Sequence, residues 1–185
     1  KVPIGNIHSY DVPGMVDRDT LYIISSYSGT TEEPVGSYKE AKKRSAKIMG
    51  ISSAGTLARM IKKGDIPGYV FDPINNPCGQ PRIGIGYSVA GILGLLKKAG
   101  VVKTTDADIK AVLDSLKKNQ PKAQAAAEKI ARELKNKIPI VISADFLAGN
   151  AHVFANQLNE NAKNFSSYFI ISELNHHLLE GLRFP

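Results

Sequence analysis

Four hydroxyl side chains surround a single glycine at residues 26–31, where the sequence reads Ser-Tyr-Ser-Gly-Thr-Thr. Two acidic residues, Glu32 and Glu33, follow directly, which is typical of the first turn of a helix. Free backbone N–H groups at a helix N-terminus attract an anion, and neighbouring hydroxyls add further hydrogen-bond donors. One hydroxyl would be enough to cap a helix, so the four together favour a phosphate-type anion site over a plain capped helix.

A second group of polar residues follows the apolar run at residues 168–171 and contains Glu173 and two histidines. Ligands of open α/β sheets bind at the carboxyl ends of strands. Glu173 could therefore act as a base that moves a proton, or could simply cap a helix starting near Leu174. His176 and His177 are adjacent and lack the spacing and the third ligand of a usual metal site, so we expect no metal here.

Apolar runs alternate with amphipathic stretches along the chain and predict the strands and helices that position these groups. The predicted strands lie at residues 20–25, 46–52, 68–73, 138–143 and 167–171. The predicted helices lie at residues 37–47, 54–63, 83–99, 104–118, 121–135 and 151–164. This alternation of strand and helix predicts an α/β fold with a parallel sheet.

The predicted helix at residues 83–99 contains four glycines, which favour close packing against a neighbouring element. A dinucleotide-binding fingerprint is the alternative for such a run. Gly84 and Gly86 would then need a third glycine at position 89, where the sequence has Val89. We therefore expect no nucleotide cofactor.

The chain has 185 residues, a hydrophobic content of 43% and a formal net charge of +7. Residues 101–138 carry nine basic and five acidic side chains, so over half of the excess lies on expected solvated helices. Because no aromatic residues interleave with these charges, we expect no nucleic-acid partner. No apolar run approaches the about 18 residues of a membrane span, so no membrane partner is expected. The single cysteine, Cys78, cannot form an internal disulfide, which favours a cytoplasmic location.

The hydroxyl-rich turn resembles the phosphosugar loop of the sugar isomerase (SIS) domain family, which typically reads Ser-x-Ser-Gly-x-Thr-x-Glu. Ser26, Ser28 and Thr31 fall on the positions whose hydroxyls hold the sugar phosphate in that family. Thr30 takes a place that Asn often fills, which is a mild departure from the pattern.

Residues 172–176, Ser-Glu-Leu-Asn-His, resemble the Pro-Glu-Leu-Asn-His segment of bifunctional phosphoglucose/phosphomannose isomerases. Two further stretches, residues 81–88 and 157–163, resemble the arginine-bearing helix start and the upstream stretch of those enzymes. The resemblance implies that Glu173 moves a proton between sugar carbons 1 and 2. It also implies that Arg82 stabilises the enediolate charge.

The resemblance implies a parallel-sheet, three-layer SIS fold that is similar to flavodoxin. We expect residues 1–100 to form a first SIS domain without its N-terminal part, residues 101–136 a helical connector, and residues 137–185 the start of a second SIS domain. The family's first Gly-rich turn, its ring-opening histidine and a C-terminal lysine find no match here. We therefore expect the chain to be a central segment of a longer protein of this kind, or a truncated relative.

The function implied is that of a phosphosugar aldose–ketose isomerase, which converts glucose 6-phosphate and mannose 6-phosphate to fructose 6-phosphate. Glu173 is expected to be a partly buried base, and neither a metal nor another cofactor is required. A phosphosugar substrate and a second copy of the chain, forming a homodimer, are the implied partners. The alternative is a non-catalytic SIS module that senses a phosphosugar and does not need Glu173.

Overall fold

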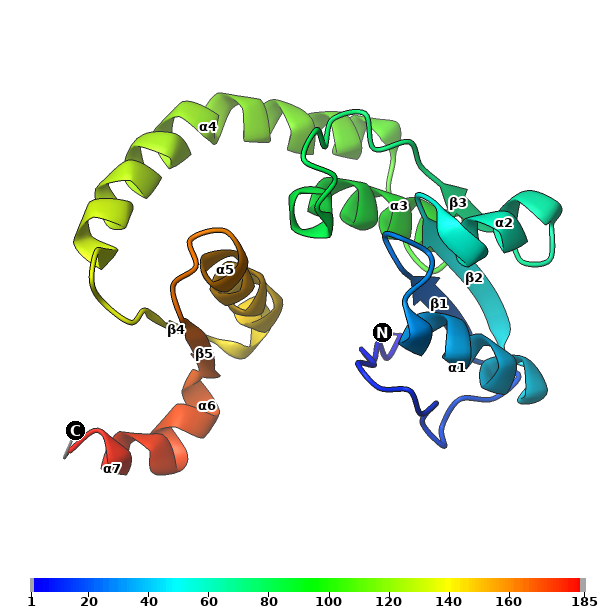
Figure 1. Cartoon of the computed structure of the whole chain (residues 1–185), viewed down its shortest axis with the longest axis horizontal. Coiled ribbons are helices and arrows are strands. Elements are labelled where there is room, and N and C mark those ends of the chain that lie inside the picture. Colours follow the sequence, from blue (N-terminus) through cyan, green and yellow to red (C-terminus); the bar gives the residue numbers. More distant parts are fainter. Residues whose placement is uncertain (1, 184–185) are drawn as a thin grey trace. The chain divides into compact units, whose positions relative to one another are not determined.

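The computed structural model describes residues 2–183 and divides the chain into two compact units, Lys1–Asp106 and Ala107–Pro185 (Figure 1). The first unit holds a three-stranded sheet in the order β1-β2-β3, and the second holds the pair β4-β5. All neighbouring strands are parallel, so the predicted α/β class with parallel strands is confirmed. The predicted domain bounds at residues 100 and 136 stay a prediction.

In the first unit, strands and helices alternate along the chain around the central strand β2. The strands are β1 (Leu21–Ser25), β2 (Lys47–Ser52) and β3 (Gly68–Val70). The helices are α1 (Glu32–Lys43), α2 (Gly55–Lys63), the short 3₁₀ turn η1 (Pro81–Ile83) and α3 (Ile85–Lys98). Each predicted element is present, with bounds that differ by a few residues.

Helices cover both faces of this sheet, which gives the first unit three layers. On one face, Ile24 of β1 is buried in a cluster with Ala41 of α1 and Leu57 of α2. On the other face, Ile51 of β2 is buried in a second cluster with Leu95 of α3. Parallel sheets are normally covered on both faces in this way, and their strands are therefore almost continuously apolar.

Helix α1 begins at Glu32, five residues earlier than the predicted start at residue 37. Pro34 lies in its first turn, where the backbone N–H groups have no partner within the helix, so the N–H that proline lacks costs nothing. The early start matters for function, because it places the helix N-terminus directly after Thr31.

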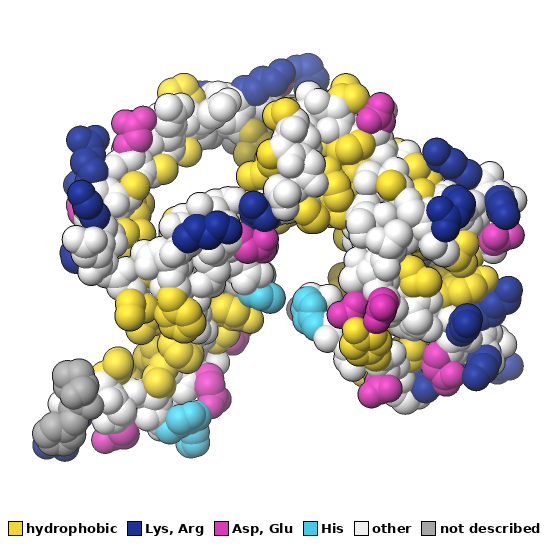
Figure 2. All heavy atoms as spheres, viewed as in Figure 1, with side chains coloured by type: hydrophobic (Ala, Val, Ile, Leu, Met, Phe, Trp, Pro, Cys, Tyr) yellow, Lys and Arg dark blue, Asp and Glu magenta, His cyan; other side chains and the backbone are white. Residues whose placement is uncertain are grey.

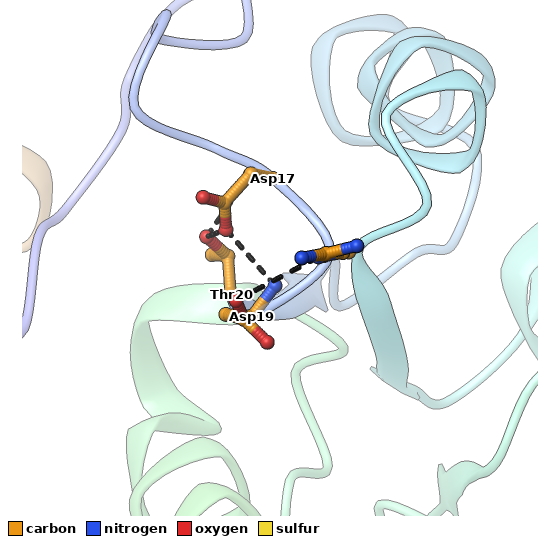
Figure 3. A network of polar contacts seen from close by, with 4 residues as sticks. Asp17, Asp19 and Thr20 are labelled. Atoms are coloured by element: carbon orange, nitrogen blue, oxygen red, sulfur yellow. Dashed lines mark hydrogen bonds and ion pairs between the residues drawn. The ribbon is translucent and has the colours of Figure 1, made fainter.

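A network of hydrogen bonds fixes the turn that leads into β1, at the end of the strand opposite to the hydroxyl-rich loop (Figure 3). The Asp17 carboxylate accepts hydrogen bonds from the Asp19 backbone N–H at 2.9 Å and the Thr20 hydroxyl at 3.0 Å. These bonds hold the pKa of Asp17 below its ordinary value, and the bond from the Asp19 N–H has the largest effect. Their contribution to stability is therefore present above the unfolded-state pKa and is lost as the pH falls through the folded-state pKa.

The second unit contains one long helix, a strand–helix–strand unit and a final run of short helical turns. Its elements are α4 (Asp106–Leu134), β4 (Ile140–Ser143), η2 (Asp145–Leu147), α5 (Ala148–Glu160), β5 (Ser167–Ile170), α6 (Ile171–Glu173), the π-helical turn η3 (Leu174–Leu178) and α7 (Leu179–Gly181). The Asn159 side chain ties α5 to β5, because it donates to the Ser166 carbonyl and accepts from the Ser166 N–H. Large apolar side chains, among them Ile142 and Phe146, remain exposed in this unit. Figure 2 shows hydrophobic side chains on the surface near the two strands.

The prediction of two separate helices at residues 104–118 and 121–135 is wrong, because α4 runs without a break from Asp106 to Leu134. Pro121 lies inside it and cannot donate to the Lys117 carbonyl. None of the α4 residues is buried, so water can hydrate that carbonyl. The Ala, Lys, Gln and Glu residues on both sides are strong helix formers, and they keep the chain helical through the proline.

Candidate functional site

The hydroxyl-rich loop lies between the carboxyl end of β1 and the N-terminus of α1, and it brings the three predicted hydroxyls together. The Thr31 Oγ1 atom lies 3.0 Å from Ser26 Oγ and 3.4 Å from Ser28 Oγ. Ser26 is buried and accepts a hydrogen bond from the Gly29 N–H, so it shapes the turn. Ser28 and Thr31 are exposed, so a ligand can reach their hydroxyls.

The first turn of α1 has no side-chain cap. Thr31 is the N-cap residue, but its side chain accepts no hydrogen bond from the helix. The plain capped helix, which was the alternative to an anion site, would have required that bond. The uncapped N-terminus, with its positive end of the helix dipole and two exposed hydroxyls beside it, is suited to binding a phosphate group.

A second turn, between β2 and α2, packs against this loop and is hydrogen-bonded to it. Ser53 donates to the Tyr27 carbonyl from its backbone N–H at 3.0 Å and from its hydroxyl at 2.7 Å. Gly29 and Gly55 both have positive φ, and the two turns touch at these glycines. A Cβ atom on Gly29 would collide with the Ala54 carbonyl, and one on Gly55 would collide with the Ser28 carbonyl. The shape of the loop therefore depends on both glycines.

We expect Gly55→Ala to lower both the stability of the first unit and its affinity for inorganic phosphate. The new methyl group would push on the Ser28 backbone, and overpacking of this kind typically costs about 1–3 kcal/mol. Gly64→Ala is the matched control, because Gly64 also has positive φ but open space around its Cβ position. Both variants carry the strain of a side chain in the left-handed backbone region, about 1–2 kcal/mol, which thermal unfolding measures. Only Gly55→Ala should also weaken phosphate binding, which calorimetry measures. Equal phosphate affinity in the two variants would contradict this account of the loop.

Arg82 lies in η1 of the same unit, directly before α3. Its guanidinium donates to the Gln80 side-chain oxygen at 3.2 Å. Gly84 lies two residues after Arg82 and packs closely on the Tyr27 ring. A Cβ atom on Gly84 would collide with that ring. The structure therefore brings the segment that carries Arg82 against the hydroxyl-rich loop, through Tyr27.

Glu173 lies in the second unit, in the short helix α6 that follows β5. Its side chain is 68% exposed and lies 3.2 Å from Nδ1 of His177. The expected partial burial of Glu173 is thus wrong for the chain as described, because a sheet of two strands with one covering helix leaves the strand end open. The helical turn η3 does begin at Leu174, but Glu173 makes no side-chain capping bond to it.

The five predicted site residues therefore come from both units. Ser26, Ser28, Thr31 and Arg82 belong to the first unit, and Glu173 belongs to the second. Sequence reasoning missed Tyr27, Ser53 and Gly55. The Ser-Ser-Ala-Gly-Thr run at residues 52–56 was the available signal, because it also follows a strand of the parallel sheet and so lies at the same edge.

Within residues 2–183, the structure places no three His, Cys, Asp or Glu side chains together in a way suited to a metal ion. In the same range, no helix has both the length and the apolar character needed to cross a membrane.

Residues 123–184 match the family model described as the bacterial phospho-glucose isomerase C-terminal SIS domain. The chain is 34% identical to the bifunctional phosphoglucose/phosphomannose isomerase of Caldicellulosiruptor bescii, over 100% of the chain and 56% of that protein. It is 33% identical to the protein of the same name from Aquifex aeolicus, over 97% of the chain and 53% of that protein. The chain thus spans about half the length of the curated relatives it matches.

Solved structures show the same fold at lower sequence identity. A protein from Clostridium difficile, described as a candidate phosphosugar isomerase, has a TM-score of 0.63 at 16% identity, over 89% of the chain and 49% of that protein. One from Salmonella typhimurium with the same description has a TM-score of 0.64 at 21% identity, over 91% and 52%. Residues 123–184 thus match a sugar isomerase (SIS) domain, and the whole chain is similar to bifunctional phosphoglucose/phosphomannose isomerases over about half of their length.

Proposed function

We propose that this chain is part of a phosphosugar aldose–ketose isomerase that converts glucose 6-phosphate and mannose 6-phosphate to fructose 6-phosphate. The observation that supports this most is the cluster of Ser26, Ser28 and Thr31 hydroxyls beside the uncapped N-terminus of α1. The names of the relatives support the same reaction.

In this proposal, the hydroxyl-rich loop holds the phosphate of the sugar. The exposed Ser28 and Thr31 hydroxyls donate to phosphate oxygens, and the buried Ser26 keeps the loop in shape. Hydrogen bonds to an ionised group are roughly twice as strong as those between neutral groups. The phosphate is distant from the reacting carbons, so this binding energy orients the sugar rather than taking part in the proton transfer.

Glu173 is the proposed base. It removes the proton from carbon 2 of the open-chain aldose, and the electron pair of that bond forms the double bond of an enediolate between carbons 1 and 2. The aldehyde oxygen becomes negatively charged, and the guanidinium of Arg82 stabilises that charge as it develops. The hydroxyl proton of carbon 2 passes to the charged oxygen on carbon 1, the carbon 2 carbonyl forms, and return of the abstracted proton from Glu173 to carbon 1 completes the ketose. No external oxidant or reductant is needed, because the sugar is oxidised at carbon 2 and reduced at carbon 1.

A phosphosugar sensor is the second candidate function. The observation that favours it is that the hydroxyl-rich loop is complete within the first unit, whereas Glu173 is exposed in the second. A sensor needs the loop alone. On the face that Figure 2 shows, basic side chains are spread out rather than gathered in one patch, so this face does not favour nucleic-acid binding.

Turnover by the protein of the full reading frame separates the two functions. The isomerase proposal predicts conversion of both glucose 6-phosphate and mannose 6-phosphate to fructose 6-phosphate. A coupled enzymatic assay measures this conversion. Binding of these phosphosugars in calorimetry without any turnover would favour the sensor. Absence of both binding and turnover would reject both functions.

We further propose that the protein forms a homodimer in the cytoplasm. Helix α3 presents exposed Val89 and the small residues Gly86, Ala90 and Gly94 beside an open groove of about 630 Å³, so another helix could approach it closely. Light scattering at tens of micromolar protein should give twice the mass of the chain, which is 20.0 kDa for this segment. A mass of one chain at that concentration, in this segment and in the full reading frame, would contradict the dimer.

A further inference from the structure

The side chain of Asn76 is buried beneath the segment that precedes Arg82, with an exposed fraction of 5%. Its amide nitrogen donates to the Tyr27 hydroxyl at 2.6 Å and to the Gln80 carbonyl at 2.8 Å. Its amide oxygen accepts from the Cys78 thiol at 3.2 Å. A buried amide with all these bonds is held in one orientation, because any movement would leave polar atoms unpaired.

Tyr27, at the other end of the first bond, is fixed on several sides. Its ring packs edge-on against Phe71 at a centroid distance of 5.4 Å, and Gly84 packs closely on the ring as well. Its backbone carbonyl accepts the two hydrogen bonds from Ser53. Because Tyr27 stands between Ser26 and Ser28, its position follows that of the phosphate-holding loop.

The second bond of Asn76 leads to the arginine. The Gln80 carbonyl accepts from Asn76, and the Gln80 side chain accepts from the guanidinium of Arg82. A continuous set of contacts thus runs from the hydroxyl-rich loop through Tyr27, Asn76 and Gln80 to Arg82. The bond between Tyr27 and Asn76 is the long-range step in this set, because those two residues lie 49 positions apart in the sequence.

We infer that Asn76 and Tyr27 are positioning residues, which hold Arg82 at a set place relative to the phosphate-holding loop. The inference rests on the proposed isomerase function, in which the loop anchors the phosphate and Arg82 acts near carbons 1 and 2. The phosphate and those carbons belong to one molecule, so the separation of the loop and the guanidinium must match the span of the sugar in its reactive bound conformation. A displacement of about 1 Å can cost on the order of 100-fold in rate.

The test compares three variants in the protein of the full reading frame. Tyr27→Phe removes only the hydroxyl that Asn76 contacts, and Asn76→Ala removes all three hydrogen bonds of the Asn76 side chain. Tyr38→Phe is the matched control, because it removes a tyrosine hydroxyl that accepts a hydrogen bond from the exposed Lys42 on the same helix, α1. We expect kcat to fall about 10- to 100-fold in the first two variants, with KM within about threefold of wild type, and no change in the control. Unchanged kcat in Tyr27→Phe would overturn the inference, as would a rise in KM equal to the fall in kcat, which would indicate a damaged phosphate loop.

A second readout keeps the inference testable if the protein proves not to be an isomerase. Cys78 is the only cysteine of the 185-residue chain, is exposed and contacts Asn76, so its alkylation rate in this chain reports on this segment. Fructose 6-phosphate should slow that alkylation in wild type and in Tyr38→Phe, and should no longer slow it in Tyr27→Phe at saturating ligand. Protection that persists fully in Tyr27→Phe would show that Tyr27 does not link the two segments. Absent turnover in wild type with ligand-dependent protection would instead reject the isomerase proposal alone.

Discussion

Replacing Glu173 by Gln is expected to lower the isomerisation rate about 10²- to 10⁴-fold, which is the usual cost of losing a general base. The amide is nearly isosteric with the carboxylate but cannot accept the carbon 2 proton. Stability should change little, because the side chain is exposed and its contact with His177 is a surface pair. Turnover of glucose 6-phosphate should be measured in the protein of the full reading frame. Exchange of the carbon 2 proton with solvent deuterium should be measured beside it, because exchange reports the base step directly.

The matched control for this variant is Glu180→Gln, in the nearby helix α7. It removes the same charge from the same unit, so any general electrostatic effect on the rate would appear in both variants. We expect Glu180→Gln to retain turnover and proton exchange. If Glu173→Gln exchanges the carbon 2 proton as fast as wild type, Glu173 is not the base and another group must be sought.

The double substitution Ser28→Ala with Thr31→Ala is expected to remove most of the affinity for phosphosugars. Each hydrogen bond to a charged group contributes about 1.5–3 kcal/mol, so losing two should weaken binding about 10²- to 10⁴-fold. Ser26 is left in place, because it is buried and its loss would distort the turn through Gly29. Fructose 6-phosphate should raise the melting temperature of wild type and leave that of the double variant unchanged.

Thr20→Ala provides a control for this experiment. It removes a hydroxyl at the other end of β1, where Thr20 bonds to Asp17. This variant should be somewhat less stable than wild type but should gain the same increase in melting temperature from the phosphosugar. Equal stabilisation of wild type and the double variant by the ligand would rule out the loop as the phosphate site.

The sequence by itself determined the parallel α/β class and the place of most elements, and it predicted an anion site at residues 26–31. These features depend on contacts between near neighbours. An apolar run such as residues 21–24 predicts a strand wherever it occurs, and hydroxyls before two glutamates predict a helix N-terminus. The structure agrees with these local patterns because helices cover both faces of the sheet in the first unit, as is usual for parallel strands.

Only the tertiary structure decided how the site is supported. The contact of Gly55 with Ser28 and the bond between Asn76 and Tyr27 join segments that are 27 and 49 positions apart, and nothing in either segment alone predicts its partner. The single helix α4 was likewise decided by its surroundings, because only a helix with no buried residue lets water hydrate the carbonyl that Pro121 leaves without a donor. Local sequence patterns set which conformations are favourable, whereas solvent access and long-range packing determine which of them the folded chain adopts.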